Sequence, residues 1–283
     1  MITTFLLAVL AVQGQGAQPA PPPPPARLQA PIDLTGYWVS VVTEDWRWRM
    51  LTPKKGDYAS LPLNAEGRKV ADGWDPAKDE ASGNACKSYG GAAIMRVPGR
   101  LHVTWQDDVT LKIDTDAGTQ SRVLHFGDAQ PPAGDAGWQG YSVAQWEFAG
   151  PPQRGGGAGG AGGAGGAGGG GRAVITIGGV VQGAGGDASG GRGRGPAPRT
   201  GSLKVITTHL KAGYLRKNGV PYSENTSVTE YFDRHTEANG DQWFTVTTIV
   251  DDPKYLDQPF VTSTHFKKEP DAAKWHPTPC SAS

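Results

Sequence analysis

Four of the six histidines lie near the ends of short β-branched runs, where an imidazole can act as a base or bind a metal. They are His102 in LHVTW, His125 in VLHF, His209 in VITTHL and His265 in VTSTHF. Successive side chains of a strand point to opposite faces, and each histidine falls on the less apolar face of its run. That face is either solvent or a polar cavity. We therefore expect solvated histidines on separate strands or, as the alternative, a metal site or acid–base pair where two or three converge.

Carboxylates inside β-prone runs are the second chemical feature. Glu147 in QWEF and Glu230 in TEYF need a charged partner or a shifted pKa if they face a core. Arg122, Arg216 and Arg234 are available as partners. Structural pairing is the expectation, and general acid or base catalysis is the alternative.

An enzyme built on these runs would use His209, His265 and Glu230 as its catalytic residues. Both histidines follow a small or β-branched residue two positions earlier, which predicts that they share one face of the sheet. GxSxG, HExxH, P-loop and paired CxxC motifs do not occur in the sequence, so the mechanisms tied to them are not indicated. The reaction class is therefore open among hydrolase, lyase and isomerase, and the sequence does not define a metal or a cofactor.

Two segments combine aromatic and cationic side chains. TEDWRWRM alternates Trp46 and Trp48 with Arg47 and Arg49, which can line a pocket for a planar or anionic ligand or form cation–π packing on an exposed edge. Residues 210–224, LKAGYLRKNGVPYSE, are expected to form a loop at a barrel mouth, where binding groups often lie. A protein that binds a small apolar or aromatic molecule is the favoured function. The expected ligand-binding residues are Trp38, Trp46, Trp105, Trp146, Tyr214, Arg216 and Tyr222.

The remainder of the chain predicts an all-β fold. Ten short runs rich in β-branched and aromatic residues, among them AAIMRV at 92–97, succeed one another with no alternating helices, which excludes a βαβ architecture. An antiparallel meander that closes into a barrel or half-barrel is the economical arrangement. One helix is expected over Leu63–Trp74, with Asn64 as N-cap and Pro76 disfavouring helix at Asp75.

Composition divides the chain into parts. Residues 1–16 begin with an uncharged apolar run and are expected to be a signal peptide. Residues 17–30 include PAPPPPPA and predict an extended linker. Residues 31–283 are expected to form a single barrel-like domain. It is interrupted at 151–200 by a segment that holds over half of the 42 glycines and is expected to be disordered.

Charge and cysteine content restrict the partners and the compartment. The formal net charge of zero argues against bulk attraction to nucleic acid or to an anionic membrane. After the leader, the sequence has no apolar stretch of the ~18 residues that a transmembrane helix needs. Cys86 and Cys280 are the only cysteines, and they are expected to form one disulfide in a periplasmic or secreted protein. Two unpaired thiols are the alternative.

The order of the local patterns resembles a widespread group of exported bacterial β-rich proteins of uncharacterised function. The patterns are WDP followed by a cysteine, GxSxxxWE at 140–147, TExF at 229–232 and DDPKYLDQP at 251–259. The opening DLTGYW resembles the Gly-x-Trp start of lipocalin-like barrels. The resemblance covers most of residues 33–268 and departs at 150–200, where such proteins usually have a tight turn. The resemblance implies an exported protein with a β-rich fold, and it brings no established activity with it.

Overall fold

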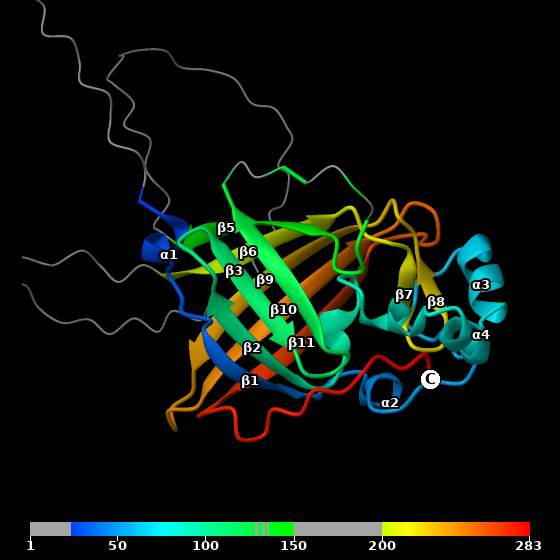
Figure 1. Ribbon diagram of the computed structural model, residues 1–283, viewed down its shortest axis with the longest axis horizontal. Coiled ribbons are helices and arrows are strands. Elements are labelled where there is room, and N and C mark those ends of the chain that lie inside the picture. Colours follow the sequence, from blue (N-terminus) through cyan, green and yellow to red (C-terminus); the bar gives the residue numbers. More distant parts are fainter. Residues whose placement is uncertain (1–23, 128–129, 132–133, 135, 150–199) are drawn as a thin grey trace, which may run out of the picture.

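The protein folds as a closed β-barrel of nine strands. The computed structural model describes residues 24–127, 130–131, 134, 136–149 and 200–283. The expected signal peptide and all but the last residue of the expected glycine-rich insertion lie outside these ranges. Around the ring the strands follow the order β1-β11-β10-β9-β6-β5-β4-β3-β2 (Figure 1). They are β1 (Gly36–Val41), β2 (Arg100–Trp105), β3 (Thr110–Thr115), β4 (Gln120–Phe126), β5 (Tyr141–Ala149), β6 (Thr200–Thr208), β9 (Ser227–Thr236), β10 (Gln242–Asp251) and β11 (Phe260–Glu269).

The barrel is mixed rather than fully antiparallel, which corrects the expected meander in one respect. β4 and β5 pair in parallel, with Leu124 opposite Ser142. Strands that alternate in direction cannot close a ring of nine, because an odd number leaves one neighbouring pair with the same direction. The segment after Phe126 therefore carries the chain back to the end of the barrel where β4 began.

One predicted strand forms a different structure. In AAIMRV, the backbone N–H groups of Ala93 and Ile94 both donate to the carbonyl of Gly90, and η2 (Ile94–Arg96) is a 3-10 helix. Residues 92–96 are all buried, so the run lacks the alternating exposure that a half-buried strand has. Because this segment is buried on every side, its residues are mostly apolar. A short apolar run in a sequence cannot by itself distinguish such a helical turn from a buried strand.

The predicted helix is confirmed as α3 (Ala65–Asp72). The Asn64 side chain caps it by accepting a hydrogen bond of 2.8 Å from the backbone N–H of Gly67. A second helix, α4 (Pro76–Ala81), begins at Pro76, with Asp75 as its N-cap. Proline ends a helix before it but fits the first helical position, so the same residue both stops α3 and starts α4. The other helical elements are α1 (Ala26–Gln29), α2 (Trp46–Arg49) and the 3-10 helix η1 (Ala85–Tyr89).

The two ends of the barrel are covered differently. α1 lies at one end, and α3 and α4 lie at the other together with the hairpin β7 (Gly213–Arg216) and β8 (Val220–Tyr222) (Figure 1). The indole N–H of Trp146 donates to the carbonyl of Ala26 at 2.8 Å. α1 and its contact with the barrel thus lie inside the segment 17–30, which was expected to be an extended linker. None of the helices in the described ranges has the length and apolar character required to cross a bilayer.

Side chains fill the barrel interior in layers. The apolar cluster toward the α1 end contains Trp38, Phe232, Phe244 and Phe266, all almost fully buried. A second apolar cluster lies under the β7–β8 hairpin and includes Tyr222. Buried residues of the barrel strands also include an arginine, a glutamate and several hydroxyl groups, namely Arg122, Ser142, Thr207, Glu230, Thr248 and Thr262.

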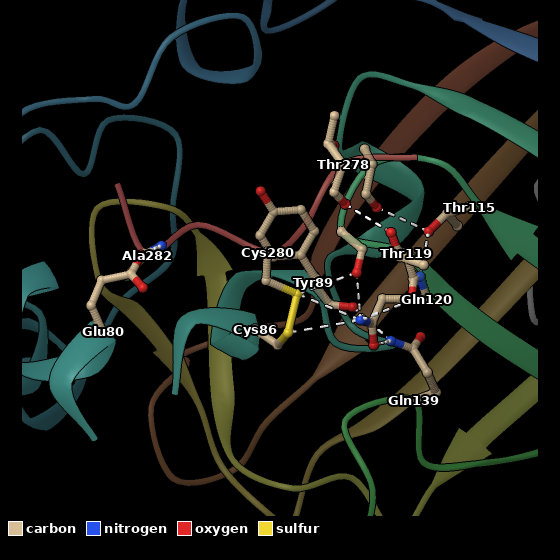
Figure 2. Close-up of a disulfide and its surroundings, with 12 residues drawn as sticks. Glu80, Cys86, Tyr89, Thr115, Thr119, Gln120, Gln139, Thr278, Cys280 and Ala282 are labelled. Carbon is tan, nitrogen blue, oxygen red and sulfur yellow. Dashed lines mark hydrogen bonds between the residues drawn. A yellow bond between two sulfur atoms is a disulfide. The ribbon is translucent and has the colours of Figure 1, made fainter. Parts of the chain in front are cut away.

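The C-terminal tail runs back along the barrel and is held to the hairpin end. A disulfide joins Cys280 to Cys86, as the sequence predicts (Figure 2). The backbone N–H of Thr278 donates to the carbonyl of Asp116 at 2.8 Å, and the hydroxyl of Thr119 donates to the carbonyl of Thr278 at 2.9 Å. Near the end of the chain, the N–H of Ala282 donates to Glu80 of α4 at 2.7 Å. The tail is therefore a fixed part of the structure.

Candidate functional site

The histidines do not converge. His102, His125 and His265 lie on the outer face of the barrel, where His102 stacks on Tyr37 and His125 stacks on Tyr141. β6 ends at Thr208, and His209 follows it as an exposed residue with a positive φ of 55°. The expectation of solvated, separate histidines thus fits the structure, and the alternative of a converging site does not. Among the described residues, no group of three or more His, Cys, Asp or Glu side chains could hold a metal ion.

The expectation that His209 and His265 share a face is wrong. On β6 the face of Val205 and Thr207 points into the barrel, whereas on β11 the face of Val261 and His265 points outward. The chain turns at His209 before its side chain can follow Thr207 inward. His265 instead lies 3.5 Å from the carboxylate of Glu44.

Glu230, the third expected catalytic residue, is a buried partner of Arg122. The guanidinium donates to the two carboxylate oxygens at 3.1 and 2.7 Å, and it also donates to the hydroxyl of Thr207 at 3.2 Å. Both charged side chains have zero exposed fraction. The structural pairing expected for a strand carboxylate is therefore found at Glu230, and neither His209 nor His265 reaches it.

Most of the aromatic residues expected to bind a ligand are structural. Trp38 is fully buried and donates to the carbonyl of Leu34, and Tyr222 is fully buried beneath the hairpin. Trp105 and Trp146 lie 6.4 Å apart, ring centre to ring centre, and close the α1 end of the barrel. Trp46 is 64% exposed. None of these residues lines the pocket described next.

Tyr214 also has a structural role. Its hydroxyl donates to Asp79 of α4 at 2.8 Å, and Lys87 donates to the other carboxylate oxygen of Asp79 at 2.6 Å. Burial, followed by the hydrogen bond to Asp79, raises the pKa of Tyr214 above its ordinary value. The three side chains tie β7 to α4 and η1.

Arg216 differs from these residues because it lines a pocket at the hairpin end of the barrel, which we call the arginine pocket. The pocket has a volume of about 300 Å³. One wall comes from α2 and the residues after it, with Trp48 and Arg49, and another comes from the end of β7, with Leu215 and Arg216. The two segments that the sequence marks as aromatic and cationic therefore meet. The other lining residues are Met50, Leu51, Thr52, Ser88, Tyr89, Ala93, Arg96, Val97, Pro98, Ala117, Lys217 and Thr278.

β1 ends at Val41, shortly before α2, which forms one wall of this pocket. β1 pairs with β11 only from Tyr37 to Val41, so among the described strands the first half of β11 pairs with β10 alone. After Val41 the chain leaves the sheet and forms α2, and η2 approaches the uncovered part of β11. The guanidinium of Arg96 lies 5.4 Å from the ring centre of Phe260, the first residue of β11. Arg96 thus lies beside a part of β11 that does not pair with β1.

Arg49 is the fully bonded arginine of the pocket. It donates to the carbonyl of Arg96 at 2.9 Å, to Glu44 at 2.8 Å and to the hydroxyl of Ser40 at 3.2 Å. Burial lowers its pKa to about 10, and the neighbouring carboxylate of Glu44 opposes that shift. Arg49 remains charged at neutral pH and links α2 to η2 and β1.

Arg96 and Arg216 each leave one terminal nitrogen without a hydrogen-bond partner in the described part of the chain. Arg96 donates to Asp45 at 2.8 Å through its other terminal nitrogen. Arg216 donates to the carbonyl of Ala59 at 3.1 Å, and its guanidinium lies 4.9 Å from the ring centre of Trp48. Burial, followed by repulsion from Arg96, lowers the pKa of Arg216 to about 10.

Sequence patterns detect only part of this pocket. Trp48, Arg49 and Lys217 belong to the two aromatic and cationic segments, although they were not among the expected binding residues. Arg96 lies in the run interpreted as a strand, and Tyr89 lies in η1, so no motif marks either of them. An arginine inside an otherwise apolar run, as in IMRV, is the one available signal, because a buried arginine needs polar partners.

A second hollow, of about 550 Å³, lies beside the β9–β10 turn and includes His235, Trp243 and His265. Its charged groups have partners. His235 lies 3.3 Å from Glu237, and Lys267 donates to Asp241 at 2.6 Å. In the described part of the chain one buried donor of this hollow, the indole N–H of Trp243, has no hydrogen-bond partner, whereas the arginine pocket has two such nitrogens, and both belong to cations.

Comparison of the chain with protein-family models, with curated proteins and with solved structures gave no match. The functional proposal therefore rests on the geometry of the arginine pocket.

Proposed function

We propose that this protein binds a small molecule with a planar or apolar body in the arginine pocket at the hairpin end of its barrel. One observation carries the proposal: two segments far apart in the sequence place Trp48 against Arg216 at the wall of a single pocket. The pocket volume of about 300 Å³ lies at the lower end of the range for small-molecule sites. Leu215, Val97 and Tyr89 supply apolar wall around the cationic groups.

The position of the pocket supports binding outside the barrel interior. Small barrels commonly hold ligands within the ring, but here Trp38, Phe244 and Phe266 fill that space. The apolar or aromatic ligand expected from the tryptophan content is therefore proposed for the pocket beside α2. A role in catalysis has less support, because the three expected catalytic residues lie apart.

Export of the protein is a further part of the proposal. The Cys86–Cys280 disulfide supports it, because disulfides persist in oxidising compartments. The resemblance to exported bacterial β-rich proteins agrees with that compartment. Fractionation of the host should place the protein in the periplasm or the medium, and a cytosolic protein with reduced cysteines would contradict this part.

Native mass spectrometry of the protein purified from its host tests the binding function. We expect an additional mass of a small molecule that is released on unfolding. Thr52→Trp should lower the bound fraction, because Thr52 is an exposed residue at the wall of the pocket. Ala273→Trp is the matched control, since Ala273 is exposed on the tail and outside the pocket. Absence of a bound molecule in the wild type would contradict the proposal.

A further inference from the structure

Arg216 is a buried cation without a carboxylate partner. Its exposed fraction is 5%, and in the described part of the chain no carboxylate oxygen lies within 4.0 Å of it. Moving a guanidinium out of water is costly unless an opposite charge compensates for the lost hydration. The carbonyl of Ala59 and the ring of Trp48 supply only partial negative charge. The carboxylates of Asp45 and Asp57 act on this charge only from beyond contact distance, and each is paired with another arginine. The fold thus compensates the charge of Arg216 only in part.

Arg96 adds to the same positive field. It lines the same pocket, is 8% exposed, and its one ion pair uses Asp45. Four cationic side chains line the pocket, namely Arg49, Arg96, Arg216 and Lys217. Within the described ranges only Arg49 and Arg96 have a carboxylate in direct contact, so Arg216 and Lys217 leave the pocket with an excess of positive charge. Lys217 lies 5.1 Å from the ring centre of Tyr89, another wall residue.

The unbonded nitrogens indicate what is missing. Buried polar groups in folded proteins almost always have a hydrogen-bond partner, and one terminal nitrogen of Arg96 and one of Arg216 have none in the described part of the chain. An acceptor that also carries negative charge satisfies the hydrogen bonds and the charge together. Carboxylate and phosphate groups are the anions that a guanidinium binds best.

We propose that the ligand of this pocket is a small organic oxyanion whose carboxylate or phosphate group is held by Arg96 and Arg216. Its apolar body packs against Trp48, Tyr89 and Leu215. This inference rests on the proposed binding function and adds the chemical class of the ligand.

Binding of matched charged and neutral probes tests the proposed chemical class of the ligand. Calorimetry at low salt would compare benzoate and phenyl phosphate with the neutral benzamide and phenol. We expect at least one anion to bind the wild type tenfold or more tightly than its neutral counterpart. Arg216→Gln should reduce anion affinity about tenfold and leave the weak neutral binding unchanged. Arg27→Gln is the matched control, because Arg27 is exposed on α1 at the other end of the barrel and outside the pocket, and its affinities should stay within twofold.

A substitution at the rim avoids any disturbance of the buried arginines. Leu51 lines the pocket and is 74% exposed, so Leu51→Glu, Leu51→Gln and Leu51→Lys should fold equally well. Affinity for the anionic probe should rise in the order Glu, Gln, Lys, with several-fold differences that shrink at high salt. Benzamide should not distinguish the three variants.

The outcomes separate the two proposals. Equal affinity for charged and neutral probes, unchanged by Arg216→Gln, would overturn the oxyanion inference and leave the binding function intact. An uncharged molecule bound to the protein purified from its host would also overturn the oxyanion inference and leave the binding function intact. Failure of every probe, together with the absence of a bound molecule in the host protein, would overturn both.

Discussion

The guanidinium of Arg122 on β4 and the carboxylate of Glu230 on β9 form a bidentate pair of hydrogen bonds across the interior of the barrel, and both groups are fully excluded from solvent. A pair of this kind gains little net stability relative to apolar residues of the same size, yet loss of one member leaves an uncompensated charge.

Glu230→Gln should therefore destabilise the protein by about 3–5 kcal/mol. The double variant Arg122→Met with Glu230→Leu should be clearly more stable than this single variant, because no buried charge is left without a partner. Urea unfolding compares the free energies of unfolding of the wild type and these variants. Glu147→Gln is the control and should cost less than about 1 kcal/mol, because its contact with Lys204 is exposed. A double variant as unstable as the single one would contradict this account.

Loss of the disulfide should reduce the free energy of unfolding by several kcal/mol. Cys86 and Cys280 are separated by 194 residues, and closing a loop of that size restricts the unfolded chain by on the order of 5 kcal/mol. Urea unfolding of Cys86→Ala with Cys280→Ala, compared with the oxidised wild type, measures the effect. Thiol labelling of the unfolded, unreduced wild type should find no free cysteine, and two labels per chain would contradict the bond.

Gly219→Ala should destabilise the β7–β8 hairpin. Gly219 has a φ of +81°, and an added Cβ would overlap the side chain of Trp74. Backbone strain and overpacking together should cost about 2–4 kcal/mol. Gly240→Ala is a matched control, because Gly240 has a φ of +87° with open space around it, so it should show the strain alone, about 1–2 kcal/mol. Thermal unfolding compares them, and equal losses would show that the contact with Trp74 is unimportant.

Stability should fall at alkaline pH through Tyr58. Burial, followed by the hydrogen bond to Asp72, raises the pKa of Tyr58 from 10.0 to about 12. Between these values the unfolded chain binds fewer protons than the folded chain, so the free energy of unfolding falls as pH rises from about 10 to about 12. Tyr58→Phe should show a shallower decline in this window. Identical alkaline slopes for the two proteins would contradict the assignment.

Replacement of residues 150–199 by an Asn-Gly turn should leave the melting temperature within a few degrees. The strands on either side already meet, since Ala149 pairs with Thr200 at the ends of β5 and β6. The entropy of closing a loop changes only slowly with its length, so a shorter connection costs nothing in the folded barrel. Calorimetry of the shortened protein checks this, and a drop of ten degrees or more would show that the segment contributes to stability.

Strand alternation predicted the barrel because its two faces differ in chemistry. On β10, for example, Phe244, Val246 and Val250 face inward, while Thr245, Thr247 and Ile249 are partly exposed. The pattern misassigned Ile94–Arg96, where burial on all sides removes the alternation. It also extended β6 through His209, because a β-branched run gives no sign that the next residue takes a positive φ.

The candidate site was less predictable, since its arginines come from three segments with no common motif. Arg216 was predicted as a binding residue, and Trp48 belongs to a segment that its composition marks as aromatic and cationic. Their contact depends on where α2 and β7 lie around the barrel, and neither segment contains a local pattern that specifies this position. Such placement is a property of the whole ring.

The pairing of β1 with β11 also has a consequence for the order of folding. β1 and β11 lie near opposite ends of the sequence, with Tyr37 paired to Glu269, so their pairing is among the least local contacts in the protein. Contacts of this kind form late, because the chain must first lose the entropy of closing a very long loop. Arg49 and Arg96 of the arginine pocket contact these two strands through Ser40 and Phe260, and Thr278 of the tail lines the pocket. Competence to bind should therefore appear only with the final closure of the ring, after most of the secondary structure has formed.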